Sequence, residues 1–143
     1  MGDALLNIDQ FLADLLLTDD ELTAEIGDGL YPDAVPPGAV YPLLIVADYL
    51  PAVDRKVIGS GRPTERIFTR ASRLIKAITT GEDGSWSYAQ GSVIMQRVET
   101  LITGSVASKI LGVSRRQQVR YPEIIGETRY NHYGHIYDIW AKD

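Results

Sequence analysis

The two histidines are the first residues whose types could support catalysis or bind a metal. His132 and His135 lie three residues apart in a segment where tyrosine and isoleucine alternate with polar residues, which predicts a β-strand. Residues three apart on a strand point to opposite faces, so the two imidazoles cannot hold one metal ion together. Because the chain contains no cysteine, thiolate metal sites, disulfides and thiol nucleophiles are excluded. We expect two partly exposed strand histidines, with no metal and no cofactor.

No other motif supplies an activated nucleophile, a phosphate-binding loop or a paired set of carboxylates. Gly59-Ser60-Gly61 begins like a dinucleotide-binding fingerprint, but Thr64 occupies the sixth position and Pro63 interrupts the turn into a helix. Walker and GxSxG patterns are absent from the sequence. We therefore expect a protein that is not an enzyme.

The basic residues offer a second kind of chemistry, contact with nucleic acid phosphates. Eleven of the fourteen lysines and arginines gather in two segments, at 55–76 and at 109–120. The net charge of −5 opposes attraction to a polyphosphate. A small nucleic-acid-binding or -processing protein is therefore the alternative function of a different class. Its candidate residues are Arg115, Arg116, Tyr121, His132 and His135.

The charges are unevenly distributed along the chain. The first fifty residues hold ten acids and no base, whereas the remainder holds nine acids and fourteen bases. Such polarity suits a subunit that contacts copies of itself, although it also arises by chance on solvated surfaces. We expect the acidic first helices and the basic region Arg62–Arg73 to face each other across a subunit interface. The candidate interface residues are Asp14, Asp19, Asp20, Glu21, Arg55, Lys56, Arg62, Arg66, Arg70, Arg73, Arg115 and Arg116.

The elements that must position these residues begin with two helices inside residues 1–27. Asp3 is a plausible N-cap for an amphipathic helix over Ala4–Leu17. Thr18 and Glu21 form a capping-box pattern for a second, short helix that stops at Gly27. Aspartates interrupt this apolar start, so we expect no membrane-spanning helix and no contact with a membrane.

The middle of the chain predicts extended structure. Four of the seven prolines lie in LYPDAVPPGAVYP, which we expect to be a surface connection. A buried strand over Leu43–Tyr49 should follow and end at Pro51. Residues 54–65 should form a loop that is mobile or ordered by a partner.

The last elements are one ambiguous segment, one helix and one hairpin. RIFTRASRLIKAIT, at 66–79, fits both a helical stripe and a β-branched strand, and its periodicity slightly favours the helix. Tyr88 to about Thr103 predicts a helix that stops at Gly104. Alternating patterns on either side of Gly126 predict two strands paired as a long hairpin. A length of 143 residues fits one domain, 1–143.

Three stretches together resemble the tail-completion or tail-terminator proteins of tailed phages, which also occur in gene transfer agents. They are LYPDAVPPGAVYPLLIVADY, RIFTRASRLIKAI and LGVSRRQQVRYPEIIGETRYNHYGHIYDIWAK. The resemblance covers most of the chain and rests on the order of elements more than on invariant residues. It implies that 66–79 is a strand. The expected fold is therefore α+β, a mixed and mostly antiparallel sheet of about four strands with helices packed on one face.

The resemblance also implies a function without catalytic residues. Members of this family form a homo-oligomeric ring, commonly hexameric, at the head-proximal end of the tail tube, where the ring ends tube polymerisation and joins the tail to the neck. The expected partners are other copies of the chain, the tail-tube protein and a neck or head-completion protein, with DNA only in transit through the channel. The expected location is the neck-proximal end of the virion tail, after assembly in the host cytoplasm. The alternative within the same class is a neck or head-completion protein.

Overall fold

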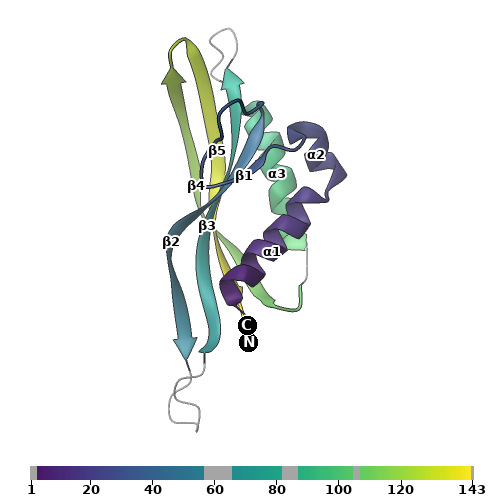
Figure 1. Cartoon of the computed structure of the whole chain (residues 1–143), viewed down its shortest axis with the longest axis vertical. Coiled ribbons are helices and arrows are strands. Elements are labelled where there is room, and N and C mark those ends of the chain that lie inside the picture. The colour runs from purple at the N-terminus through teal and green to yellow at the C-terminus, as the bar shows by residue number, and fades with distance from the viewer. Residues whose placement is uncertain (1–2, 57–65, 82–86, 105–106, 143) are drawn as a thin grey trace.

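A computed structural model describes residues 3–56, 66–81, 87–104 and 107–142. The elements are, in chain order, α1 (Ala4–Leu17), α2 (Asp20–Ile26), β1 (Leu30–Pro32), β2 (Leu43–Lys56), β3 (Arg66–Gly81), α3 (Ala89–Gly104), β4 (Ile110–Ile125) and β5 (Thr128–Ala141). One sheet has the strand order β1-β2-β3-β5-β4. All of its pairs are antiparallel except β1 with β2, and the helices cover one face (Figure 1). The predicted α+β fold is confirmed, with five strands instead of about four.

The first two helices start at aspartate caps. The side chain of Asp3 accepts hydrogen bonds from the backbone N–H groups of Leu5 and Leu6, as the sequence predicted for α1. The predicted Thr18 cap of α2 is wrong, because Asp19 takes that position and accepts from the N–H of Leu22 at 2.9 Å. The hydroxyl of Thr18 instead donates back to a carbonyl of α1.

The proline-rich segment contains a strand that the sequence did not predict. Residues Leu30–Pro32 form β1, which pairs in parallel with Leu44–Val46. Proline is tolerated here because β1 is an edge strand. Its open side has no neighbouring strand to accept a hydrogen bond, so the backbone N–H that proline lacks is not needed there. The following residues 33–42 cover part of the sheet face that the helices leave open, and the ring of Tyr41 packs at a tilt against that of Tyr130, with ring centroids 5.0 Å apart.

The second strand runs further than expected. β2 continues past Pro51 to Lys56, so the prediction that proline ends it is wrong. Pro51 lies between Leu50 and Val53, where the register of β2 with β3 shifts. At such an irregularity the ladder does not need a hydrogen bond from every backbone N–H, so proline can be accommodated. The predicted 54–65 loop is corrected at its start, because residues 54–56 are paired strand; 57–65 lie outside the described residues.

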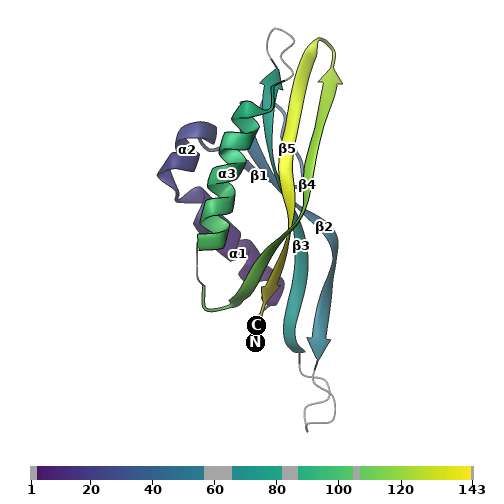
Figure 2. The ribbon, with the colours of Figure 1, turned by 180° about the vertical axis from the view of Figure 1, so that it is seen from behind.

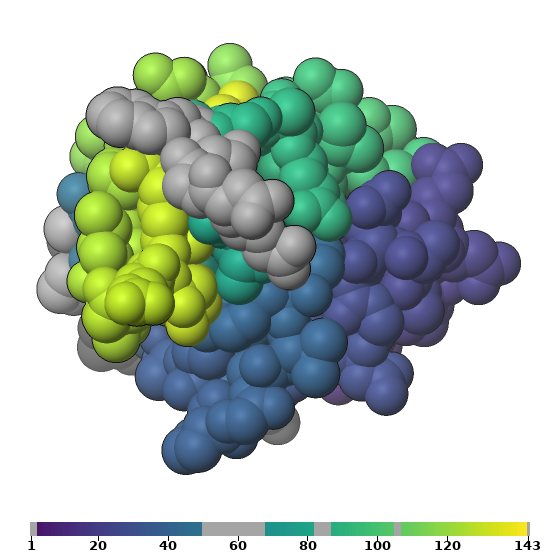
Figure 3. Space-filling view, turned by 90° about the horizontal axis from the view of Figure 1, so that it is seen from above, coloured from purple at the N-terminus to yellow at the C-terminus, as the bar shows by residue number. Residues whose placement is uncertain are grey.

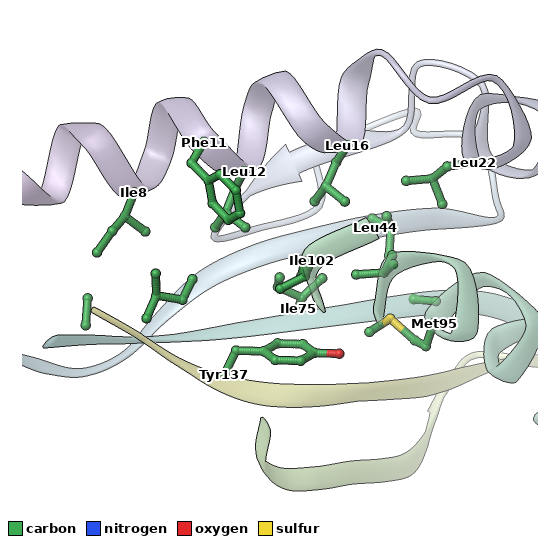
Figure 4. Packing of buried hydrophobic residues seen from close by; sticks show 14 of the residues in the cluster. Ile8, Phe11, Leu12, Leu16, Leu22, Leu44, Ile75, Met95, Ile102 and Tyr137 are labelled. Atoms are coloured by element: carbon green, nitrogen blue, oxygen red, sulfur yellow. The ribbon is translucent and has the colours of Figure 1, made fainter. Parts of the chain in front are cut away.

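The core lies between the helices and the sheet (Figure 4). Helix α1 contributes Ile8, Phe11, Leu12 and Leu16, helix α3 contributes Ile94, Met95, Val98 and Ile102, and the sheet contributes Leu44, Ala71, Ile75, Ala77, Tyr137 and Ile139. Helix α3 matches its predicted span to within one residue at each end. The ambiguous segment is strand β3, as the resemblance implied, and its register places it between β2 and β5.

The long strands extend beyond the helical layer at both ends of the sheet. The β2–β3 end projects in one direction and the β4–β5 hairpin in the other, as two opposite views show (Figures 1 and 2). The predicted hairpin is confirmed, and its two-residue turn begins at Gly126, where φ is 62°. A positive φ at the first turn residue is typical of a type II′ turn, which fits the twist of paired strands.

Candidate assembly surface

Several charges that the sequence assigned to an interface are paired inside the subunit. The guanidinium of Arg97, on α3, donates to the carboxylate of Asp19 at 2.9 and 2.6 Å, and it lies 3.3 Å from Glu21. The hydrogen bond from Arg97 lowers the pKa of Asp19 from 3.8 to about 2. Sequence reasoning did not identify Arg97, and it is this residue that joins α2 to α3.

Arg73 is also paired within the chain. Its side chain is 6% exposed, below α1, with nitrogen atoms 3.3 Å from Asp9 and 2.9 Å from Asp48. Asp9 belongs to the acidic first helix, so the acidic and basic segments meet here within one subunit. Arg73 and Asp19 therefore leave the set of interface candidates.

The other predicted basic residues that the structure describes do not lie together. Arg115 lies 3.2 Å from Glu99 of α3, and Arg116 lies 3.7 Å from Asp138. Arg70 is half-buried on β3. The backbone pairing of β2 with β3 places Arg55, Lys56 and Arg66 at the projecting end of these strands, but their side chains are not described. Arg62 lies outside the described residues. Among the predicted acids, Asp14 and Asp20 are exposed on the helical layer.

The histidines are buried, which corrects the expectation of partial exposure. His132 and His135 are each 5% exposed. His132 stacks on Tyr121 with ring centroids 4.4 Å apart, while His135 contacts Tyr133 and Tyr137 edge to face. Burial lowers the pKa of both imidazoles, so both are neutral near pH 7.

The residues of the nucleic-acid alternative do not form one surface. His135 and Arg115 lie on the helix-covered side of the sheet, whereas Tyr121 and His132 stack on the opposite face. The ammonium of Lys76 is 2.8 Å from the hydroxyl of Tyr121. No group of three His, Asp or Glu side chains able to hold a metal occurs among the described residues. None of the described helices is long and apolar enough to cross a membrane.

A groove lies at the β1 edge of the sheet, and we call it the α1–β1 groove. It has a volume of about 420 Å³ and runs between α1 and the first strands. Its apolar lining is Leu12, Ala13, Leu16, Leu17, Leu30, Tyr31, Pro32 and Val46, and its charged lining is Asp9, Asp33, Asp48 and Arg73. Just past β1, the backbone N–H of Asp33, which also lines the groove, donates to the carbonyl oxygen of Val46 at 3.0 Å.

An apolar surface lies at the opposite edge of the sheet, at the end of the β4–β5 hairpin. Ile124 and Ile125, which we call the hairpin tip, are 67% and 61% exposed. They are the last residues of β4 before the turn, in the region that faces the viewer in Figure 3. Sequence reasoning missed both surfaces. The adjacent isoleucines before the Gly-Glu turn, in PEIIGET, were a visible signal for the tip, whereas the groove joins residues far apart in the chain.

Comparison with known proteins identifies a similar fold but no family. No family model matches the chain, and no curated protein does. Among solved structures, a chain from the virion of a native gene transfer agent (GTA) particle superimposes with a TM-score of 0.59. The sequences are 16% identical, and the match covers 91% of this chain and 92% of that chain. This protein therefore shares its fold, over nearly its whole length, with a protein chain found in a gene transfer agent virion.

Proposed function

We propose that this chain is a structural subunit of a phage-type virion, and that it acts as a tail terminator. The observation that carries the proposal is the shared fold with a chain of a gene transfer agent virion over 91% of the residues. The three stretches that resemble tail-completion proteins support the finer assignment. In this role the chain forms a ring, ends polymerisation of the tail tube and joins the tail to the neck, with no catalytic step.

The arrangement of surfaces supports assembly around a rotation axis. The α1–β1 groove and the hairpin tip lie at opposite edges of one sheet, so a contact between them is heterologous. Heterologous contacts that repeat with a closing rotation generate a ring in which every copy uses both surfaces. A homohexamer is the expected size, because the family that the sequence resembles commonly forms hexamers. The partners are then other copies of the chain, the tail-tube protein and a neck protein, with DNA passing through the channel.

Length control of tail tubes tests this function. The tail-tube protein of the same particle is polymerised with and without the purified chain, and tube lengths are measured by electron microscopy. With the chain we expect shorter tubes that stop growing and carry a ring at one end, because a ring on the growing end excludes further tube subunits. Tubes of unchanged length, with the chain retained on portal complexes instead, would support the neck or head-completion protein and contradict the tail terminator.

A further inference from the structure

A cluster of side chains on the open face of the sheet joins the outer half of β4 to the strands beside it, and we call it the His132 cluster. It consists of Lys76 of β3, Tyr121 and Glu123 of β4, and His132 of β5. The ring of Tyr121 stacks on that of His132, and its hydroxyl accepts a hydrogen bond from the ammonium of Lys76 at 2.8 Å. The Nε2 atom of His132 lies 3.4 Å from a carboxylate oxygen of Glu123. Each of these contacts involves Tyr121 or His132.

The outer half of β4 has few other side-chain contacts to hold it. Residues 120–125 are all exposed, in the hairpin that projects beyond the helical layer (Figure 1). In the part of the chain that the structure describes, β4 is an edge strand that pairs with β5 alone. On the helix-covered face, the guanidinium of Arg120 lies 4.9 Å from the ring centre of Tyr88. Segments with few buried contacts open most easily, so loss of the His132 cluster favours opening of this half of the hairpin.

The surroundings of His132 oppose a positive charge on its ring. The side chain is buried, and its Nδ1 atom has no hydrogen-bond partner. An imidazolium donates from both nitrogens, so a proton on Nδ1 would be a buried donor without an acceptor. The titratable groups around the ring on this face are Lys76 of β3, Tyr121 and Glu123 of β4, and Tyr130 of β5. Burial, with the cation of Lys76 added, outweighs Glu123 and lowers the pKa of His132.

His135 repeats this arrangement on the helix-covered face of β5. It is buried against Tyr133 and Tyr137, and its Nδ1 atom also lacks a hydrogen-bond partner. The charged groups near it are Arg115 of β4 and Glu99 of α3, which lie 3.2 Å apart. Burial lowers the pKa of His135, the cation of Arg115 adds to this effect, and Glu99 opposes it. Proton uptake is therefore unfavourable on both faces of β5.

We propose that the β4–β5 hairpin is an acid-sensitive element, in which proton uptake by His132 and His135 at mildly acidic pH releases the outer half of β4 from the sheet. A folded-state pKa below the ordinary 6.5 of histidine means that the stabilisation is present above that pH and decreases as the pH falls. With two histidines and no cysteine in the chain, these are the side chains whose ordinary pKa lies between pH 5 and pH 7. The inference concerns the single subunit and does not depend on the proposed function.

Urea denaturation at two pH values tests the energetic part. We expect the unfolding equilibrium constant of the wild type to rise about tenfold or more between pH 7 and pH 5. Replacing both histidines with phenylalanine keeps aromatic rings at these positions and removes the titration, so this control should lose most of that rise. The Asp19–Arg97 pair does not interfere, because the pKa of Asp19 is about 2.

Nuclear magnetic resonance measures the protonation of the wild type directly, whether or not a variant folds. The Cε1–H signals should report a pKa below 6.5 for both imidazoles. Lys76→Met should raise the pKa of His132 and leave that of His135 in place, because Lys76 lies on the open face.

Hydrogen exchange followed by mass spectrometry tests where the chain opens. After correction for intrinsic exchange, residues 119–125 should lose about tenfold of their protection between pH 7 and pH 5 in the wild type and much less in the double phenylalanine variant. Imidazoles that titrate at or above pH 6.5 in the folded chain would overturn the inference. Wild-type stability, or protection of residues 119–125, that stays the same at pH 7 and pH 5 would also overturn it.

Discussion

Substituting alanine for Gly134 should destabilise the domain by about 3 kcal/mol or more, at the upper end of what overpacking costs. A Cβ at this position would overlap the carbonyl oxygen of Ile75 and lie 2.5 Å from the Cα of Lys76. Both are backbone atoms of the neighbouring strand β3. The clash can therefore be relieved only if β3 and β5 separate at the centre of the sheet. The measurement is the free energy of unfolding from urea denaturation.

Gly112 provides the matched control for Gly134. It also lies in a strand, but nothing stands within 4 Å of its added Cβ. We expect Gly112→Ala to leave stability unchanged or to raise it by up to about 1 kcal/mol, because alanine restricts the unfolded chain. Equal stability of the two alanine variants would show that β3 and β5 do not approach as closely as described.

Removal of the Asp19 carboxylate should have the second-largest effect. Asp19→Ala loses the N-cap of α2, worth about 1 kcal/mol, and a charge-assisted hydrogen-bond pair to Arg97, worth about 1.5–3 kcal/mol. Because the side chain of Arg97 is 31% exposed, solvent screening brings its hydrogen bonds to the lower end of that range, and we expect a loss of about 2–3 kcal/mol in the free energy of unfolding. Asp19→Asn keeps a good cap and should lose less. The control Asp20→Asn changes an exposed neighbour and should stay within about 0.5 kcal/mol of the wild type.

The same carboxylate gives stability a defined pH dependence. The pKa of Asp19 is about 2 in the folded chain, below its ordinary value of 3.8. A lowered folded-state pKa means that the stabilisation is present above about pH 4 and is lost as the pH falls through 2. Unfolding free energies measured between pH 5 and pH 2 should therefore fall more steeply for the wild type than for Asp19→Asn. Parallel curves for the two proteins would contradict the Asp19–Arg97 pair.

Elements with local signals could be predicted from the sequence, whereas β3 could not be assigned from its own pattern. Helix α1 carries its cap at Asp3 and its apolar stripe within one segment. In β3, Ala71, Ile75 and Ala77 face the helices while Ile78 packs under residues 33–42 on the other side. Burial on both faces removes the alternation that marks a strand, so a helical spacing appeared by coincidence.

The remaining fold errors depend on long-range partners. Strand β1 is three residues long and exists because β2 lies beside it, which no local pattern encodes. Pro51 interrupts β2 in sequence but is accommodated where its register with β3 shifts. In both cases pairing with a neighbouring strand outweighs the intrinsic conformational preference of the residues.

The candidate surface was harder to predict than the fold. Charge asymmetry is visible in the sequence, but it does not distinguish partners in the same chain from partners in a neighbour. Asp19 and Arg97 are 78 residues apart in the sequence and yet meet in one subunit. The groove likewise brings together residues from α1, β1, β2 and β3. Only the exposed isoleucines of the hairpin tip carried a signal that the sequence alone displays.

The most direct test of self-assembly is the native mass of the purified chain, measured alone and with tail-tube protein. We expect a closed ring whose mass is a whole multiple of 15.8 kDa, with six copies, and we expect tube protein to stabilise it further. A species of 15.8 kDa under both conditions, with no ring and no complex with the tube, would contradict it.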